Sequence, residues 1–169
     1  MTDDRTTDGD AELAALLERP GPGPHRTTIE VDGVPVETLA DLPPLRDRLL
    51  FVGLNPSPVS VEAGHYHQGT LGHRFWGRLK QATILPADTD LDTADDALVA
   101  AGHGITDLHK VPSPRDDAPD SVLRAGVGPL WTKVALWRPG PGRSISIGVP
   151  AGGGCPFTRT AYERRQVRR

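Results

Sequence analysis

Asn55 is the residue whose type and setting most directly suggest chemistry. It stands in the segment Gly53-Leu54-Asn55-Pro56, directly after an apolar run, where constrained backbone holds its carboxamide in place. A carboxamide oxygen can orient a water molecule for attack, although it cannot accept a proton as a carboxylate can. The alternative interpretation is structural, because asparagine before proline often closes an Asx-turn at the end of a strand.

Histidines offer a second kind of chemistry. His65 and His67 are separated by one residue. His103 and His109 lie farther along the chain, with Asp107 between them, and either set could supply metal ligands. No pair of histidines at helical spacing supports such a site, and neither does a dense cluster of carboxylates. We therefore expect no metal ion and no other cofactor.

Composition favours one globular domain with many loops. The 169 residues suffice to bury a core, and 19 glycines and 17 prolines indicate frequent turns. The single cysteine, Cys155, excludes an intramolecular disulfide and a metal site of four thiolates. No apolar stretch approaches the roughly 20 residues that a membrane span needs, and the acidic start is unlike a signal peptide. We expect a cytoplasmic monomer that does not bind membranes.

Charge by itself argues against a nucleic-acid-binding protein, since the formal net charge is −3. Residues 1–48 carry 11 acidic and 5 basic residues (−6), and residues 49–139 carry 10 and 8 (−2). Residues 140–169 carry 1 and 6 (+5). A nucleic-acid-binding protein needs a local basic face rather than a basic total, but these distributions show no convincing one.

Strands and helices are expected to alternate along the chain. Residues 27–39 alternate around Asp32-Gly33, a strong hairpin signal, and residues 48–53 read as a buried strand. A loop follows through residue 70. The remaining predicted elements are helices over 73–82, 93–102 and 122–134, the last broken at Gly128-Pro129, and a strand over 104–108. This order predicts an α/β fold with a mainly parallel sheet, whose ligands bind where Asn55 falls, at the carboxyl ends of the strands.

Three regions divide the chain. Residues 1–24 are expected to be disordered apart from a short helix over 11–19 and a proline–glycine linker. Residues 25–139 form the predicted α/β domain. Residues 140–169 form a basic tail, rich in glycine and proline, with one possible strand in the segment SISIGV.

Four segments together resemble the mismatch-specific uracil/thymine-DNA glycosylase family, part of the uracil-DNA glycosylase superfamily. They are, in chain order, GLNP (53–56), GHYHQGTLGHRFW (64–76), GITDLHKVPS (104–113) and LWTKVALWRP (130–139). They follow the family's order at fitting separations, and the likeness covers about residues 45 to 139. The resemblance implies a three-layer α/β sandwich with a mainly parallel central sheet, incomplete at its C-terminal end.

The resemblance also implies monofunctional base excision on double-stranded DNA that contains uracil or a mismatch. Such an enzyme extrudes the nucleotide, and water attacks the sugar carbon while the base leaves as an anion. Asn55 would then hold the water, while backbone amides of its loop stabilise the departing base. The implied substrate-binding residues are Gly53, Leu54, Pro56, Ser57, Tyr66 and His67, and the implied DNA contacts are Ser60 and Arg74.

An aromatic ring is needed to stack on the extruded base. Tyr66 is the candidate, and His67 is its rival because the loop is one residue longer than is usual in the family. The alternative for Tyr66 is a ring that only packs its loop onto the core. Phe75 and Trp76 are expected to be core residues.

The resemblance ends near Pro139. The family's next strand and its later loop, of the form Pro-Asn/Ser-Pro-Ser-Gly, which enters the duplex as a wedge, are not recognisable in residues 140–169. This abrupt change suggests a truncation or a shifted reading frame. Three alternatives stay open: an active glycosylase, a catalytically impaired relative that keeps the pocket, and an unrelated α/β hydrolase or metal-dependent enzyme that uses the histidines.

Overall fold

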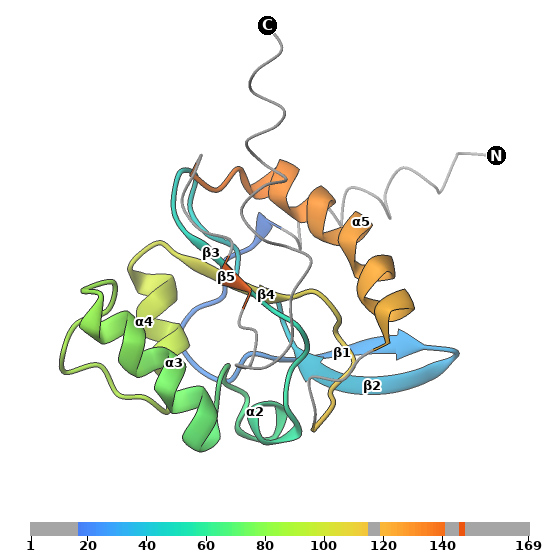
Figure 1. Ribbon diagram of the computed structural model, residues 1–169, viewed down its shortest axis with the longest axis horizontal. Helices are drawn as coiled ribbons and strands as arrows, with labels where there is room; N and C mark the ends of the chain where they lie inside the picture. Colours follow the sequence, from blue (N-terminus) through green and yellow to red (C-terminus); the bar gives the residue numbers. More distant parts are fainter. Residues whose placement is uncertain (1–16, 115–118, 141–145, 148–169) are drawn as a thin grey trace, which may run out of the picture.

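The computed structural model describes residues 17–114, 119–140 and 146–147. The elements are β1 (Arg26–Val31), β2 (Val34–Leu39), β3 (Leu50–Gly53), α2 (Pro58–Ala63), α3 (Gly69–Gln81), α4 (Ala94–Ala100), β4 (Gly104–Asp107), α5 (Asp120–Trp137) and β5 (Ser146–Ile147). They form a mixed α/β structure with a two-stranded and a three-stranded sheet (Figure 1). The predicted α/β class is therefore confirmed. Most of the predicted N-terminal helix and of the tail lies outside the described residues.

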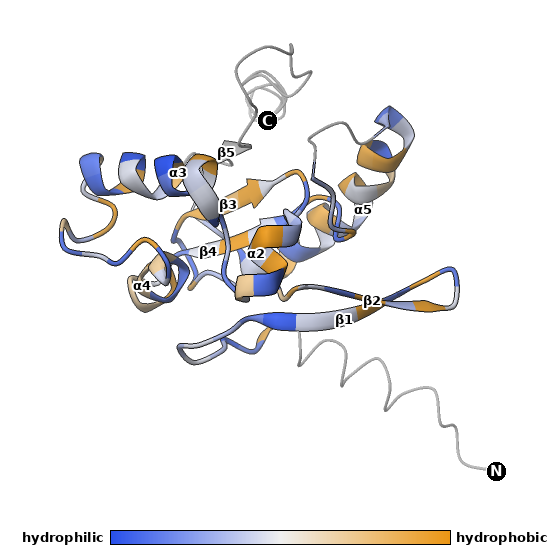
Figure 2. Cartoon of the chain, turned by 90° about the horizontal axis from the view of Figure 1, so that it is seen from below, coloured by the Kyte–Doolittle hydropathy of each residue, from blue (hydrophilic) through white to orange (hydrophobic). Residues whose placement is uncertain are grey.

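The hairpin predicted around Asp32-Gly33 is present as β1 and β2. Asp32 and Gly33 have φ values of +51° and +78°. A two-residue hairpin turn that follows the right-handed twist of its strands needs positive φ at both positions, which favours aspartate followed by glycine. The antiparallel register pairs Arg26 with Leu39 and Val31 with Val34. The hairpin lies apart from the parallel sheet, beside α2 (Figures 1 and 2).

The parallel sheet has the strand order β4-β3-β5. All four residues of β3 are buried, as expected for a run without polar alternation. β3 pairs in parallel with β4 along one edge and with β5 along the other. The strands predicted over 48–53 and 104–108 are therefore confirmed, and β5 lies within the SISIGV segment.

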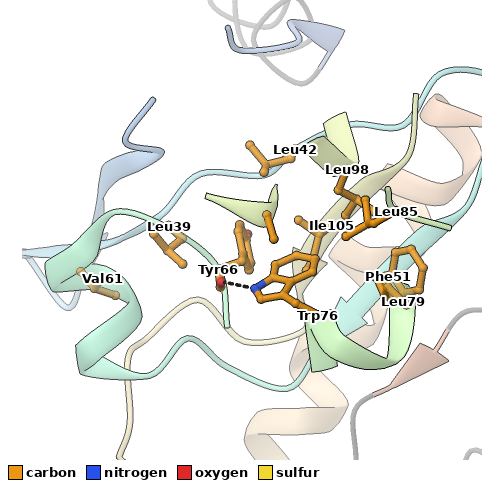
Figure 3. Packing of buried hydrophobic residues seen from close by; sticks show 11 residues of the cluster. Leu39, Leu42, Phe51, Val61, Tyr66, Trp76, Leu79, Leu85, Leu98 and Ile105 are labelled. Carbon is orange, nitrogen blue, oxygen red and sulfur yellow. Dashed lines mark hydrogen bonds between the residues drawn. The ribbon is translucent and has the colours of Figure 1, made fainter. Parts of the chain in front are cut away.

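Two apolar clusters cover opposite faces of β3. Phe51 belongs to a cluster with buried residues of α3 and α4, among them Trp76 (Figure 3). Leu50 and Val52 instead pack with Trp137 of α5. Because successive strand residues point to opposite faces of a sheet, α3 and α4 lie against one face and α5 against the other.

The prediction of a loop through residue 70 is wrong, because α2 and the first two residues of α3 lie within that range. Ser57 begins α2, and its Oγ accepts a hydrogen bond from the backbone N–H of Ser60 at 3.2 Å. Pro58 then occupies the first turn, where a missing N–H has no cost. Gly64 ends the helix with φ +79°, a left-handed conformation that glycine adopts readily.

The break predicted at Gly128-Pro129 is also wrong, because α5 runs unbroken from Asp120 to Trp137. Proline removes one helical hydrogen bond and favours a bend, but packing on the sheet outweighs this local cost. The outer face of the helix leaves Trp131 52% exposed. Within the described ranges, no helix combines the length and the apolar character that a membrane crossing requires.

Candidate active site at the ends of β3 and β4

The loops that follow β3 and β4 run side by side. The N–H of Leu108 donates to the carbonyl of Gly53 at 2.8 Å, and the N–H of His109 donates to that of Leu54 at 2.8 Å. Farther along, Ser113 donates to the carbonyl of Pro56 at 3.1 Å. These bonds extend the β3–β4 pairing beyond both strands. We call residues 53–57 and 107–113 the strand-end site.

The side chain of Asn55 connects its own loop to the loop after β4, and within the described part of the chain only the Nδ2 end of its carboxamide is hydrogen-bonded. Its Nδ2 donates to the carbonyls of Ser113, at 3.2 Å, and Pro56, at 3.3 Å. Its Oδ1 is buried and has no hydrogen-bond partner among the described residues. The Asx-turn interpretation is therefore wrong, because such a turn needs this oxygen to accept a backbone N–H. A buried acceptor without a partner costs about 1–3 kcal/mol, unless water or a ligand satisfies it.

Asp107 places a second buried acceptor at the same strand ends. The residue is 4% exposed, and its Oδ2 has no hydrogen-bond partner among the described residues. Its register partner is Gly53, and a Cβ at Gly53 would lie 2.1 Å from Oδ1 of Asp107. Burial raises the pKa of Asp107 to about 6, against the opposing charges of Lys110 and Lys133. Gly53 therefore leaves the space that this carboxyl group occupies.

An ion-pair network lies near enough to Asp107 to influence its pKa. Asp41 binds the ammonium groups of Lys110 and Lys133, each at 2.6 Å, and accepts a hydrogen bond from Thr106 Oγ1 at 2.5 Å. Burial opposes the ionisation of Asp41, but the two lysines overcome it and hold the pKa of Asp41 below its ordinary value. Burial also lowers the pKa of Lys133. Two cations are thereby fixed near a buried carboxyl group.

Sequence reasoning did not find this network and considered Asp107 only as a metal ligand. Asp41 lies between β2 and β3, and Lys133 is on α5, so only the folded chain brings them together. One available signal was the position of Asp107. Asp107 ends a buried strand that neighbours the strand before Asn55, and such a residue lies at the ligand-binding edge of a parallel sheet.

Tyr66, predicted to stack on a base, lies in the core instead. It is 2% exposed and belongs to the apolar cluster of Figure 3. Its hydroxyl donates to the carbonyl of Ala40 at 2.8 Å and accepts from Lys110 Nζ at 3.1 Å. The ring is therefore closed to a base in this conformation, and the alternative interpretation, packing of the loop onto the core, describes its position.

His67 is placed more favourably than Tyr66 for contact with a ligand. It is only partly buried, and its backbone adopts a left-handed φ of +53°. Its ring centroid lies 4.1 Å from that of Phe75, with a 36° angle between the planes, and edge-on to Trp76 at 5.5 Å. Burial lowers the pKa of His67 to about 4, so the ring is neutral at pH 7. Of the two residues predicted to stack, His67 is partly exposed and Tyr66 is buried.

The predicted serine contacts are engaged in local structure. Ser60 is 3% exposed, and its Oγ accepts the N–H of Gln68 at 3.0 Å and lies 2.9 Å from Oγ of Ser57. The hydroxyl of Ser60 is therefore used in local structure, and its contact with DNA stays a prediction. Ser57 is partly exposed, although its hydroxyl caps α2. Arg74 is exposed on α3, and its contact with DNA stays a prediction.

These observations define an α/β protein with a polar site at the carboxyl ends of its parallel strands. Comparison with known proteins found no protein-family model that matches the chain and no curated protein that matches it significantly. The functional assignment therefore depends on the geometry of the site and on the sequence motifs.

Proposed function

We propose that the protein is a monofunctional DNA glycosylase, which hydrolyses the N-glycosidic bond of a uracil, or a mispaired thymine, flipped out of duplex DNA. The observation that carries this proposal is Asn55, whose buried Oδ1 lacks a partner while its Nδ2 is fixed by two carbonyls. A water that donates to Oδ1 would be held in one orientation, at the edge where parallel sheets bind ligands. The motifs at 53–56 and 104–113 support the same assignment.

The architecture we propose is the three-layer sandwich of the uracil-DNA glycosylases. It is supported by the packing of α3 and α4 on one face of β3 and of α5 on the other. In this arrangement both faces of the sheet are covered, so its carboxyl edge is the open place for a ligand.

In this mechanism Asp107 supplies the proton acceptor that Asn55 cannot be. Because burial raises its pKa to about 6, the carboxyl group is ionised at pH 7 and above, and it is a stronger base than an exposed aspartate. Its Oδ2 is free of protein partners within the described residues and can accept the proton of the attacking water. The water oxygen bonds to the sugar carbon, and the electron pair of the C–N bond leaves with the base.

The departing base needs contacts that favour its negative charge. Pro56 and Pro58 carry no N–H, and the N–H of Ser60 donates to Ser57 Oγ, so the backbone donors that remain at the start of α2 are those of Ser57 and Val59. One donor aimed at the departing base typically contributes about 3 kcal/mol. His67, whose ring packs against Phe75, would stack on the extruded base. Because His67 is neutral at pH 7, it would contribute stacking rather than charge.

An excision assay tests the proposal. The full chain is incubated with duplex DNA containing a single uracil, with a chelator present, and abasic product is measured at single turnover. Asn55→Ala should lower the rate about 100-fold or more, as the loss of a single positioning group does in other enzymes. Asp92→Asn, at an exposed position on the loop before α4, serves as the matched control and should leave the rate unchanged. Equal rates for Asn55→Ala and the unaltered chain would refute the assignment of Asn55.

A catalytically impaired relative is the second candidate, favoured by the break in the motifs after Pro139. This candidate predicts affinity for uracil-containing duplex without excision. Translating the underlying nucleotide sequence in its other frames would show whether a continuation resembling the family exists. If that continuation restores excision when it replaces residues 140–169, the second candidate describes the chain as printed.

A further inference from the structure

Four side chains with metal-binding atoms converge beside α4, away from the strand-end site. They are His25, His65, Asp95 and Asp96, and one nitrogen or oxygen atom of each lies within 4.8 Å of the others. They come from three places: the residue before β1, the loop between α2 and α3, and the first turn of α4. We call these four residues the histidine–aspartate cluster.

The cluster is enclosed by protein. His25, His65 and Asp95 are 4%, 9% and 0% exposed, and the side chain of Asp96 is 19% exposed. His65 Nδ1 lies 2.9 Å from Asp95 Oδ1, and His25 Nε2 lies 2.8 Å from Asp96 Oδ1. The two imidazole rings meet edge to face, with centroids 5.6 Å apart. Buried imidazoles that turn toward a common pair of carboxylates differ from a solvated acidic surface.

Backbone N–H groups also donate to both carboxylates. The N–H of Tyr66 donates to Asp95 Oδ2 at 2.8 Å. The N–H of Gly23 donates to both oxygens of Asp96, at 3.1 and 3.3 Å. Hydrogen bonds of this kind orient the ligating carboxylates of metal sites and are a second layer of such sites.

We infer that the histidine–aspartate cluster binds one divalent transition-metal ion of the zinc class. Two imidazole nitrogens and two carboxylate oxygens suit zinc, whereas magnesium prefers oxygen ligands. Bond lengths of about 2.0–2.1 Å in a tetrahedron place neighbouring ligand atoms about 3.3 Å apart. The ligand atoms here start from pair distances of 2.8 and 2.9 Å and a largest separation of 4.8 Å, so adjustments of about 1.5 Å or less would form the site.

Such an ion would have a structural role. Four protein ligands fill a tetrahedral zinc ion and leave no position for a substrate. The ion would link the chain before β1, the loop between α2 and α3, and the start of α4, which hydrogen bonds already connect. This inference does not depend on glycosylase activity.

Zinc chloride titrated into the chelator-treated full chain tests the inference. We expect one equivalent to bind with a Kd below about 1 μM, and zinc at 100 times the Kd to raise the free energy of unfolding by about 2.7 kcal/mol. Cobalt in place of zinc should give the visible absorption of a tetrahedral ion, and magnesium should have no effect. Binding weaker than about 100 μM, or a cobalt spectrum without tetrahedral character, would overturn the inference.

Two variants locate the ion. His25→Ala and Asp96→Asn should each weaken zinc binding about 100-fold or more. His73→Ala is the matched control, because His73 and Asp92 form a separate histidine–aspartate pair at 3.2 Å, with side chains 31% and 73% exposed. Zinc affinity unchanged in both cluster variants would place the ion elsewhere and refute the inference. If either variant fails to fold, the zinc affinity and the cobalt spectrum of the unaltered chain still test whether a tetrahedral site exists.

Discussion

The strand-end site and the histidine–aspartate cluster differ in whether their buried polar atoms have hydrogen-bond partners. In the strand-end site, Asn55 Oδ1 and Asp107 Oδ2 are buried without a protein partner within the described residues. In the cluster, the fully buried Asp95 accepts hydrogen bonds from His65 and from the N–H of Tyr66. Because an unpaired buried polar group costs more free energy than a paired one, the free acceptors of the strand-end site are the less favourable arrangement, and we propose that a ligand or water satisfies them.

The largest expected effect is at Asp95. Replacement by alanine leaves His65 Nδ1 and the N–H of Tyr66 without their acceptor, and breaking a buried pair in this way costs about 3–5 kcal/mol. Urea denaturation of Asp95→Ala measures the loss. Asp92→Ala is the control, because its side chain is 73% exposed and its removal should cost less than about 0.5 kcal/mol. Equal free energies of unfolding for the two variants would show that the hydrogen bonds of Asp95 do not stabilise the fold.

Gly53→Ala should also destabilise the protein, because the added methyl group collides with Asp107 in the strand-end site. The added Cβ would meet Asp107 Oδ1 at 2.1 Å, and such overpacking costs about 1–3 kcal/mol. Adding Asp107→Ala to Gly53→Ala should recover part of this loss, because it removes the colliding carboxyl group. Gly77→Ala offers a control, since a Cβ there meets nothing within 4 Å and alanine favours the helix. A double variant no more stable than Gly53→Ala would contradict the packing described here.

Asp107→Asn should stabilise the protein at high pH. The folded pKa of about 6 lies above the ordinary 3.8, so the folded state holds its proton more tightly, and the unaltered protein gains stability as pH falls from about 6 to 4. Asparagine resembles the protonated carboxyl group at every pH. Thermal unfolding should show an advantage of at most about 3 kcal/mol for the variant at pH 8, closing toward pH 4. A constant difference across this range would mean that the Asp107 carboxyl is not the titrating group.

The same variant sharpens the catalytic assignment. If Asp107 accepts a proton during excision, the rate of the unaltered chain should rise through pH 6 as the carboxyl ionises. That rise should be absent in Asp107→Asn, whose rate should be lower at pH 8. A rise of equal size in both proteins would assign the titration to another group.

The smallest effect on stability is expected for Asn55→Ala. The change removes a buried oxygen without a partner, which favours the variant, and two hydrogen bonds from Nδ2, which favours the unaltered chain. We expect the free energy of unfolding to change by less than about 1 kcal/mol. Measured with the excision assay, a large loss of rate at nearly constant stability would separate function from folding at this residue.

Local sequence signals predicted much of the fold. Asp32-Gly33 specified a hairpin because two adjacent residues had to adopt positive φ, and the unbroken apolar run of β3 specified a buried parallel strand. The position of Asn55 at the end of that strand followed from the same run. Where local signals competed with packing, prediction was less successful: Pro129 suggested a break, yet α5 continues across it.

The polar groups around the candidate site could be predicted only in part. Asp41, Lys110 and Lys133 are far apart along the chain, and neither residue type nor spacing shows that they meet. Likewise, His65 was considered with His67, although its partner in space is Asp95 and its neighbour is His25. Contacts between distant segments depend on the tertiary arrangement, which cannot be deduced from the spacing of residues in a single sequence.

Tyr66 joins the two regions contrasted above. Its N–H reaches Asp95, its hydroxyl contacts Lys110, and its carbonyl accepts the indole N–H of the fully buried Trp76 at 3.1 Å. The indole therefore lies where it can sense events in either region through its fluorescence. With Trp131 and Trp137 replaced by phenylalanine, Trp76 would become a single fluorescent probe for both proposals, the metal ion at the histidine–aspartate cluster and DNA at the strand-end site.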